Sequence, residues 1–154
     1  MNIVENIKVI EHGRGGLLLR LLGLGPSLAP VKGISQVQGL LDRNSSWAKK
    51  RTIKGVRKMI ANSSSIITLW ENKRLIGFGR STSDYVYRGL LWDVIVEKDY
   101  QKRGLGKLLV KSLLESKSIK NVEKIYLMTT NCREFYEGCG FVECHKQLLL
   151  NIRN

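Results

Sequence analysis

The sequence has few of the residues that build disulfide frameworks, metal sites or rigid linkers. Its 154 residues include three cysteines, two histidines and two prolines. Cys132, Cys139 and Cys144 are odd in number, lack paired spacing and have no accompanying group of histidines, so they indicate neither a disulfide scaffold nor a zinc site. We therefore expect no bound metal, and a reducing compartment fits this cysteine usage best.

Long hydrophobic runs are also missing. The apolar segment 17–24 is interrupted by Arg20 and is far shorter than the run that a bilayer-spanning helix requires. Glu5 and Glu11 precede it, which is unlike the start of a secretory signal. We therefore expect neither a transmembrane helix nor a secretory signal, and no membrane partner.

Negative charge is scarce. Lysine and arginine together number 26 against 13 acidic residues, so the net charge is +13, and the basic residues are spread along the chain. This balance favours an anionic partner, and nucleic acid, a membrane surface, an acidic protein or a phosphate-rich cofactor would each satisfy it; a solvated basic surface is the alternative. We find no nucleic-acid recognition motif and no segment where basic and aromatic residues interleave, so a nucleic-acid partner is the less favoured interpretation.

The rest of the composition is that of one folded domain. Hydrophobic residues make up 43% of the chain, which is more than disordered sequences carry. Glycines and both prolines punctuate residues 1–33, so we interpret this part as an N-terminal extension with short elements, including a candidate strand at 17–22. The main domain is then expected over 34–154.

Apolar periodicity predicts the order of the elements in that domain. Apolar residues recur at helical spacing in three segments, which predicts helices over 34–41, 53–60 and 105–114. Runs of β-branched and aromatic residues predict strands over 66–70, 75–78, 85–96 and 122–128. A short helix over 132–137 and an extended segment over 141–152 complete the chain. This order predicts a mixed α/β sheet, with 85–96 as its central strand.

A glycine-containing turn joins this central strand directly to a helix. Backbone N–H groups at a helix N-terminus are unpaired, and Gly104 and Gly106 have no Cβ that would keep an anion away from them. Lys102, Arg103 and Lys107 add positive charge. The pattern predicts a phosphate-binding turn that is neither a Walker loop nor a dinucleotide fingerprint. The alternative is an ordinary helix start with basic residues for solubility.

The turn at Gln101 to Gly106 and a second segment at Phe135 to Phe141 resemble two motifs of the GNAT acetyltransferase family. Gln101-Lys102-Arg103-Gly104-Leu105-Gly106 matches its pattern of Gln or Arg, two residues, Gly, one residue, and Gly or Ala at a strand-to-helix junction. Phe135-Tyr136-Glu137-Gly138-Cys139-Gly140-Phe141 is similar to the segment that carries the family's catalytic tyrosine. The resemblance runs from about Ser35 to the C-terminus. It implies the GNAT fold, an α/β (α+β) arrangement with a mixed, mainly antiparallel sheet whose splayed middle strands are flanked by helices.

The resemblance also implies that acetyl-coenzyme A is the cosubstrate. In this family the amides of the turn hold the pyrophosphate, and the strand before it pairs with the pantetheine arm. Many members carry Asn or Asp seven residues before the tyrosine, where this chain has Thr129, so Asn131 either takes that contact or caps the short helix. The implied coenzyme-binding residues are Val94, Ile95, Val96, Gln101, Lys102, Arg103, Gly104, Leu105, Gly106, Lys107, Asn131 and Tyr136.

Two further stretches, 76–80 and 91–96, look like the plastid and cyanobacterial branch of the family. Plant members of that branch acetylate arylalkylamines such as serotonin, and also protein lysines and N-termini. The resemblance therefore implies an N-acetyltransferase that acts on a primary amine of one of these kinds, located in the cytoplasm or the plastid stroma. A coenzyme A-binding protein without activity and a basic nucleic-acid-binding module are the alternatives.

Two residues are candidates for the proton transfers of amine acetylation. An alkylammonium has a pKa of about 10.4 and must lose a proton before it attacks, and Asp93 interrupts the apolar central strand where it can bind or deprotonate that group. The alternative is a structural carboxylate paired with Arg88 or Arg80. Tyr136 is the candidate acid for the leaving thiolate, as the resemblance implies; without it, a core ring would be the preferred interpretation.

The acceptor and the oligomeric state are less constrained by the sequence. Trp92, with Asp93, is a candidate acceptor-binding residue, and Trp47, Tyr85 and Tyr87 are further aromatic candidates, although such rings are more often core residues. Strand alternation places Trp92 and Asp93 on opposite faces unless a bulge intervenes. The apolar stretch 148–150 is a candidate homodimer contact.

Overall fold

A five-stranded sheet organises the chain, with its strands in sequential order. The computed structural model describes residues 6–145 and 149–151, and every element below lies in that part. The strands β1 (Ile7–His12), β2 (Ser65–Glu71), β3 (Arg74–Ser83) and β4 (Arg88–Val96) pair antiparallel, and β5 (Lys124–Tyr126) pairs parallel with β4. The predicted mixed, mainly antiparallel sheet is thus confirmed. The predicted central strand 85–96 is β4, which lies between β3 and the short β5, so the central strand is β3.

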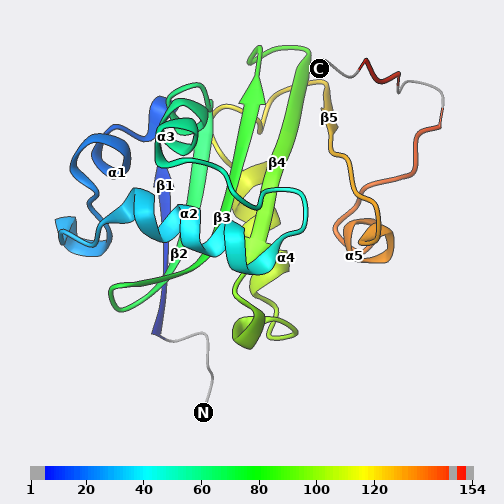
Figure 1. Cartoon of the computed structure of the whole chain (residues 1–154). Helices are drawn as coiled ribbons and strands as arrows, with labels where there is room; N and C mark the ends of the chain where they lie inside the picture. The colour runs from blue at the N-terminus through cyan, green and yellow to red at the C-terminus, as the bar shows by residue number, and fades with distance from the viewer. Residues whose placement is uncertain (1–5, 146–148, 152–154) are drawn as a thin grey trace.

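Helices cover both faces of this sheet. On one face lie α1 (Leu17–Leu22), α2 (Gly33–Asn44) and α3 (Ile53–Ala61), and α4 (Leu105–Leu114) lies behind β3 and β4 on the other (Figure 1). Each layer has its own core, one built around Trp70 and Phe78 and the other around Leu109 and Leu113. The short helix α5 (Arg133–Glu137) follows β5 at the margin of the second core.

The N-terminal part of the chain corrects one sequence-based prediction. Residues 17–22 form the helix α1, not a strand, and the first strand lies earlier, at β1. Leucine is a strong helix former, and Gly23 ends the helix in the left-handed conformation, where its N–H binds the carbonyl groups of Leu18 and Leu19. Because β1 pairs with β2, residues before Gly33 contribute directly to the main sheet.

The two strands of the predicted cofactor site separate early. Only three residue pairs join β4 and β5, from Arg88↔Lys124 to Leu90↔Tyr126, while β4 continues to Val96. Beyond Leu90, the edge of β4 that faces β5 therefore has no strand partner within the described residues. The predicted final strand over 141–152 is wrong where it is described, because 141–145 and 149–151 form no strand; 146–148 and 152 lie outside the described residues.

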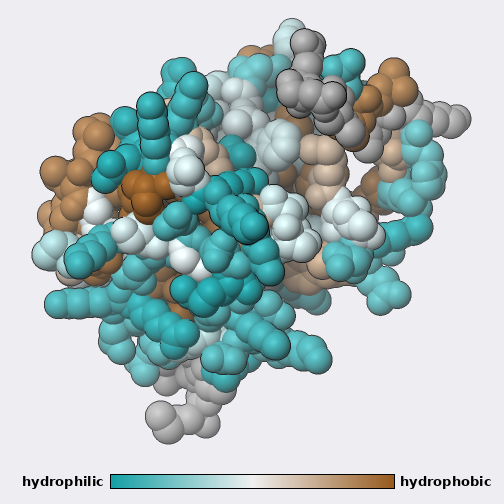
Figure 2. Space-filling view, in the orientation of Figure 1, coloured by the Kyte–Doolittle hydropathy of each residue, from teal (hydrophilic) through white to brown (hydrophobic). Residues whose placement is uncertain are grey.

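The surface is mostly hydrophilic on the face that carries α2 and α3, with an apolar patch over α1 at its left edge (Figure 2). That patch includes Leu17, Leu21 and Leu22, which are all more than half exposed. Among the described residues, no helix has the length and apolar character needed to cross a membrane.

Candidate active site

The turn after β4 has the backbone geometry of an anion cradle. Lys102 and Gly104 adopt left-handed conformations, with φ of 60° and 80°, and Gly104 is the N-cap of α4. The first helical bond runs from the Leu108 N–H to the Gly104 carbonyl at 3.0 Å. The amides from Lys102 to Lys107 therefore have no hydrogen-bond partner within the described residues, and an anion can accept from them.

The two glycines of the turn serve different purposes. A Cβ at Gly104 would have no atom within 4 Å, so this side of the turn opens to free space. A Cβ at Gly106 would approach the Phe135 ring to between 3.1 and 3.2 Å, so this glycine lets α5 pack closely against the start of α4. Gly104 thus keeps the cradle accessible, and Gly106 brings the motif around Tyr136 beside it.

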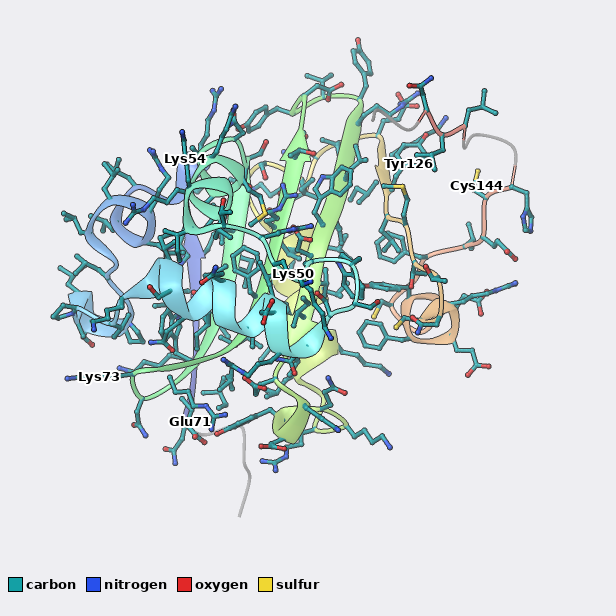
Figure 3. The ribbon with its side chains drawn as sticks, viewed as in Figure 1. Lys50, Lys54, Glu71, Lys73, Tyr126 and Cys144 are labelled. Carbon is teal, nitrogen blue, oxygen red and sulfur yellow. The ribbon has the colours of Figure 1, made fainter. Side chains whose placement is uncertain are left out.

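Positive charge surrounds the cradle. Lys102, Arg103 and Lys107 are exposed, and the Arg103 guanidinium lies over the Tyr100 ring at 5.2 Å from its centroid. Arg74 lies 5.5 Å from the same centroid, and the Tyr100 hydroxyl donates to Glu71, which is labelled at the lower end of the sheet in Figure 3. Tyr100 therefore holds two arginine side chains beside the turn.

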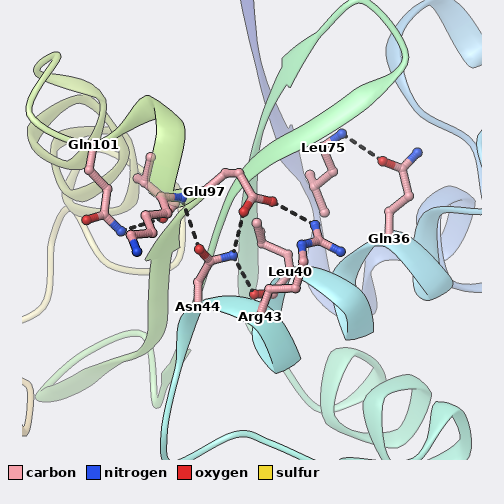
Figure 4. Close-up of polar contacts among 9 residues, drawn as sticks. Gln36, Leu40, Arg43, Asn44, Leu75, Glu97 and Gln101 are labelled. Atoms are coloured by element: carbon pink, nitrogen blue, oxygen red, sulfur yellow. Dashed lines mark hydrogen bonds and ion pairs between the residues drawn. The ribbon is translucent and has the colours of Figure 1, made fainter.

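Polar contacts around the buried Glu97 fix the turn to α2 (Figure 4). Glu97, which is 6% exposed, accepts hydrogen bonds from Arg43 at 2.7 Å and from Asn44 at 3.1 Å, both at the end of α2. The Lys98 N–H in turn donates to the Asn44 side chain at 2.9 Å. The Gln101 side chain folds back and donates to the Val96 carbonyl at 3.0 Å, which sets the start of the turn against the end of β4.

A β-bulge in β4 places Trp92 and Asp93 on one face. Phe78 pairs with Ile95 and Arg80 with Trp92, so two residues of β4 oppose the single residue Gly79. Asp93 has φ of 51°, the left-handed conformation that such a bulge accommodates. Arg80 contacts both side chains, with its guanidinium carbon 5.5 Å from the Trp92 ring centroid. The bulge thus removes the alternation that would have separated them.

Asp93 is a buried carboxylate held by two arginines. Its side chain is 4% exposed, Arg80 Nε donates to Oδ2 at 2.8 Å, and Arg51 Nη1 lies 3.0 Å from Oδ1. Burial by itself would raise the pKa of this carboxyl, but the hydrogen bonds and charges of the two arginines outweigh it and lower the pKa. The predicted alternative partner Arg80 is therefore present, whereas Arg88 pairs with Glu123 instead.

Tyr136 lies in an aromatic cluster near the start of α4. Its ring meets those of Phe135 and Phe141 edge to face, at centroid distances of 4.9 and 6.0 Å. Burial, together with the nearby thiols of Cys132 and Cys139, raises the pKa of Tyr136 to about 12. The hydroxyl is thus protonated at neutral pH, and the ring is packed against its aromatic neighbours. The role of proton donor stays a prediction.

The region before α5 departs from the predicted capping. The N-cap of α5 is Cys132 and no side chain caps the helix, so a cap by Asn131 is wrong. Thr129, seven residues before Tyr136, accepts from the Cys132 N–H at 3.1 Å and closes this loop instead. Cys132 and Cys144 are exposed, and Cys144 lies on the outer C-terminal segment away from the sheet (Figure 3).

The remaining aromatic candidates are more accessible than core residues would be. Trp47 and Tyr87 are each 61% exposed, whereas Trp92 is half-buried and donates to Thr82 at 2.8 Å. Tyr85 lines a polar cavity of about 210 Å³ at the end of the β3–β4 hairpin opposite the phosphate turn. Trp92 is therefore the aromatic candidate that lies directly beside the Asp93 cluster.

Two long-range polar contacts of the site could not be predicted from the sequence. Arg51 reaches Asp93 from the loop between α2 and α3, and Glu97 fastens α2 to the turn. The apolar strand interrupted by Asp93 signalled a paired carboxylate, but long-range partners have no signature in a single sequence. No group of three or more potential metal ligands comes together within the part of the chain that the structure describes.

Comparison with known families supports this geometry. The acetyltransferase (GNAT) domain matches residues 62–143, which extend from the end of α3 past the Tyr136 motif. The chain belongs to the GNAT acetyltransferase family. The GNAT match thus includes both the glycine-containing turn after β4 and the aromatic cluster around Tyr136.

Several GNAT relatives come from plastid-bearing organisms or cyanobacteria. The chain is 34% identical over 102 residues to an uncharacterized N-acetyltransferase, ycf52, of Pyropia yezoensis, covering 63% of this chain and 58% of that protein. It is 40% identical over 72 residues to the histone acetyltransferase TAP1 of Glycine max, covering 46% of this chain and 31% of that protein. It is 38% identical over 72 residues to the chloroplastic GCN5-related N-acetyltransferase 2 of Arabidopsis thaliana, covering 46% of this chain and 28% of that protein. The chain therefore spans from about a quarter to three fifths of these relatives' lengths.

Solved GNAT structures share the fold at lower identity. A Xanthomonas campestris acetyltransferase of this family has a TM-score of 0.71 at 21% identity, covering 96% of this chain and 93% of its own. Glucosamine-6-phosphate N-acetyltransferase from Arabidopsis thaliana has a TM-score of 0.65 at 16% identity, covering 97% and 100%. These likenesses extend over nearly the whole chain, so residues before the matched segment also belong to a GNAT fold.

Proposed function

We propose that this protein transfers the acetyl group of acetyl-coenzyme A to a primary amine. The observation that carries the proposal is the cradle at Lys102–Lys107, with unpaired amides, open space at Gly104 and three cations, next to a β4 edge that has no strand partner beyond Leu90. A diphosphate fits the cradle, and an extended amide-containing arm fits the strand edge. The residues present therefore suit the coenzyme.

In this proposal, each part of the coenzyme has its own set of residues. The amides and side chains of Gln101 to Lys107 bind the diphosphate, and the backbone of Val94, Ile95 and Val96 binds the arm. Bound acetyl-coenzyme A supplies the thioester that the amine nitrogen attacks. Asn131 and Tyr136, on the loop and helix across from β4, complete the coenzyme contacts.

Proton transfer to the departing sulfur is assigned to Tyr136. Its pKa of about 12 keeps the hydroxyl protonated, so the phenol donates when the thioester bond breaks and negative charge develops on sulfur. The aromatic contacts with Phe135 and Phe141 fix the ring, and thereby the direction of the hydroxyl.

For Asp93, the contacts favour an orienting role over direct deprotonation. Both oxygens already face guanidinium groups, and the lowered pKa makes the carboxylate a weak base. We assign the removal of the ammonium proton to water at the open side of the cluster. Asp93 and Trp92 then shape the acceptor site, Asp93 through Arg80 and Arg51.

The acceptor proposed from the family resemblance is an arylalkylamine such as serotonin or the amine of a protein lysine or N-terminus. The test is release of free thiol from acetyl-coenzyme A against serotonin, tryptamine, polyamines, lysine peptides and peptides with free N-termini. Acetylation of at least one amine, confirmed by mass, is expected. Coenzyme binding without turnover on any of these amines would favour a sensor or scaffold instead.

We propose the plastid stroma or the cytoplasm as the location, supported by the chloroplastic relative in Arabidopsis. Homodimerisation through 148–150 is the weaker proposal. Leu149 and Leu150 are 99% and 79% exposed, and Leu148 lies outside the described residues.

A further inference from the structure

The cluster at the bulge of β4 carries more positive than negative charge. Arg51 and Arg80 share the single carboxylate of Asp93, so two positive charges face one negative charge and leave an excess of +1. This excess is partly removed from water, because the side chains of Arg80 and Arg51 are 14% and 31% exposed. Partly buried charge of one sign is poorly solvated, which favours a bound counter-charge.

Both guanidinium groups still have donors to offer. Arg80 uses only Nε on Asp93, and Arg51 uses only Nη1, which contacts Asp93 and the Met59 sulfur. The other terminal nitrogens have no hydrogen-bond partner among the described residues. Among the described residues, no buried side-chain nitrogen lacks a hydrogen-bond partner. Since these terminal nitrogens have no partner, they are not fully buried and are accessible to solvent. A guanidinium offers five N–H donors in a planar fork that matches carboxylate or phosphate oxygens.

The position of the cluster ties it to the acceptor. Asp93 immediately precedes Val94, where the coenzyme arm is proposed to begin, and the Trp92 ring lies against Arg80 on the same face. A molecule whose amine reaches the thioester therefore has its other groups near these donors. This step rests on the proposed acetyl transfer.

We propose that the acceptor is a small amine that also carries a carboxylate or phosphate group, in place of a simple arylalkylamine or a protein lysine, and that Arg80 and Arg51 bind this anionic group. A polyamine or a lysine-rich peptide would bring further positive charge to a cluster that already has an excess. Because the three side chains are recessed, the anionic group must sit on a short chain close to the amine.

The test compares acceptors that differ only in the anionic group. Tryptophan is paired with tryptamine for a carboxylate, and glucosamine 6-phosphate with glucosamine for a phosphate, with kcat/KM measured by thiol release. In at least one pair, the anionic member is expected to be preferred. In Arg51→Gln, the Arg80–Asp93 pair remains and the excess charge is lost, so we expect that preference to fall about tenfold or more. Arg51→Lys should retain part of it.

The matched control is Arg57→Gln, which removes one exposed positive charge that makes no hydrogen bond or ion pair with a described residue, and should leave the preference unchanged. Each variant is first checked for an unaltered acetyl-coenzyme A-induced rise in thermal midpoint. If neither anionic member is preferred, or Arg51→Gln keeps the full preference, the inference is wrong while acetyl transfer stands. If no acceptor turns over with any protein, the proposed function itself is overturned, and the inference with it.

Discussion

At the scale of single residues, the surroundings of two ionisable side chains in the site, Asp93 and Tyr136, shift their pKa values in opposite directions. The Asp93 carboxyl, held by two arginines, has a lowered pKa and stays charged, whereas the buried Tyr136 phenol has a raised pKa and stays neutral. A permanently charged carboxylate suits positioning, and a neutral phenol suits proton donation. The assignments in the proposed mechanism follow from these two surroundings.

Removal of the Tyr136 hydroxyl tests its assigned role. For Tyr136→Phe we expect kcat to fall by about 10²-fold, in line with the loss of a general acid, with little change in acetyl-coenzyme A affinity because the packed ring is kept. Steady-state kinetics and calorimetric titration measure the two quantities. Unchanged kcat would remove Tyr136 from the mechanism, whereas lost affinity with normal kcat would make it a binding residue only.

At the scale of elements, Asp93 joins three parts of the chain. Through Arg80 and Arg51, it links β4 to β3 and to the loop between α2 and α3. Glu97 makes a second joint, between the end of β4 and the end of α2. The two carboxylates lie at either end of the segment 94–96, so the strand edge proposed to bind the coenzyme arm is fixed on both sides.

These joints make stability depend on pH in a defined direction. The folded-state pKa of Asp93 is lowered, so its ionised form stabilises the fold above the unfolded pKa of about 3.9, and this contribution is lost as pH falls through the folded value. For Asp93→Asn we expect a loss of about 3 kcal/mol or more near pH 7, because two partly buried arginines lose their partner.

Urea unfolding of both proteins from pH 7 to pH 3 measures this difference. The difference should narrow as pH falls below the unfolded pKa of about 3.9, because the carboxyl then takes up a proton in the unfolded chain while the folded protein still holds it ionised. A difference that is absent at pH 7, or that is constant down to pH 3, would contradict an ionised Asp93 in the joint.

The elements also show what the sequence was able to predict. Periodicity located α2, α3 and α4, because each buries one apolar stripe against the sheet. Periodicity failed for α1, because only Leu19 is buried and the leucine run therefore shows no apolar stripe. The left-handed glycines at its two ends, Gly16 and Gly23, delimit the helix instead. The sequence did not predict the bulge at Asp93. The bulge depends on how β4 pairs around Gly79 and on two arginines that are distant in sequence.

At the scale of the whole molecule, part of the net charge of +13 is concentrated around the proposed active site. Three of the cations surround the cradle, Arg74 lies over Tyr100, and Arg51 and Arg80 pair with Asp93. The surface over α2 and α3 is broadly hydrophilic. A phosphate-rich cosubstrate is an anionic partner that accounts for the cations at the turn. The excess charge of +1 at the Asp93 cluster favours binding of a second anion, and the anionic group of the inferred acceptor is that anion.

The central claim is that the turn at Gly104 binds the coenzyme diphosphate, and a thermal unfolding scan tests it most directly. At acetyl-coenzyme A concentrations about 100-fold above Kd, linkage predicts a midpoint rise of about 5 to 10 °C for the wild-type protein. Gly104→Val should abolish this rise, because a branched side chain enters the open side of the cradle and strains a left-handed position.

Gly140→Val is the matched control, because Gly140 has φ of 93° and no atom within 4 Å of the place its Cβ would take. It should lower the midpoint of the free protein to a similar extent yet keep the rise with acetyl-coenzyme A. A wild-type midpoint that does not move at saturating acetyl-coenzyme A, or an equal rise in Gly104→Val, would contradict the account.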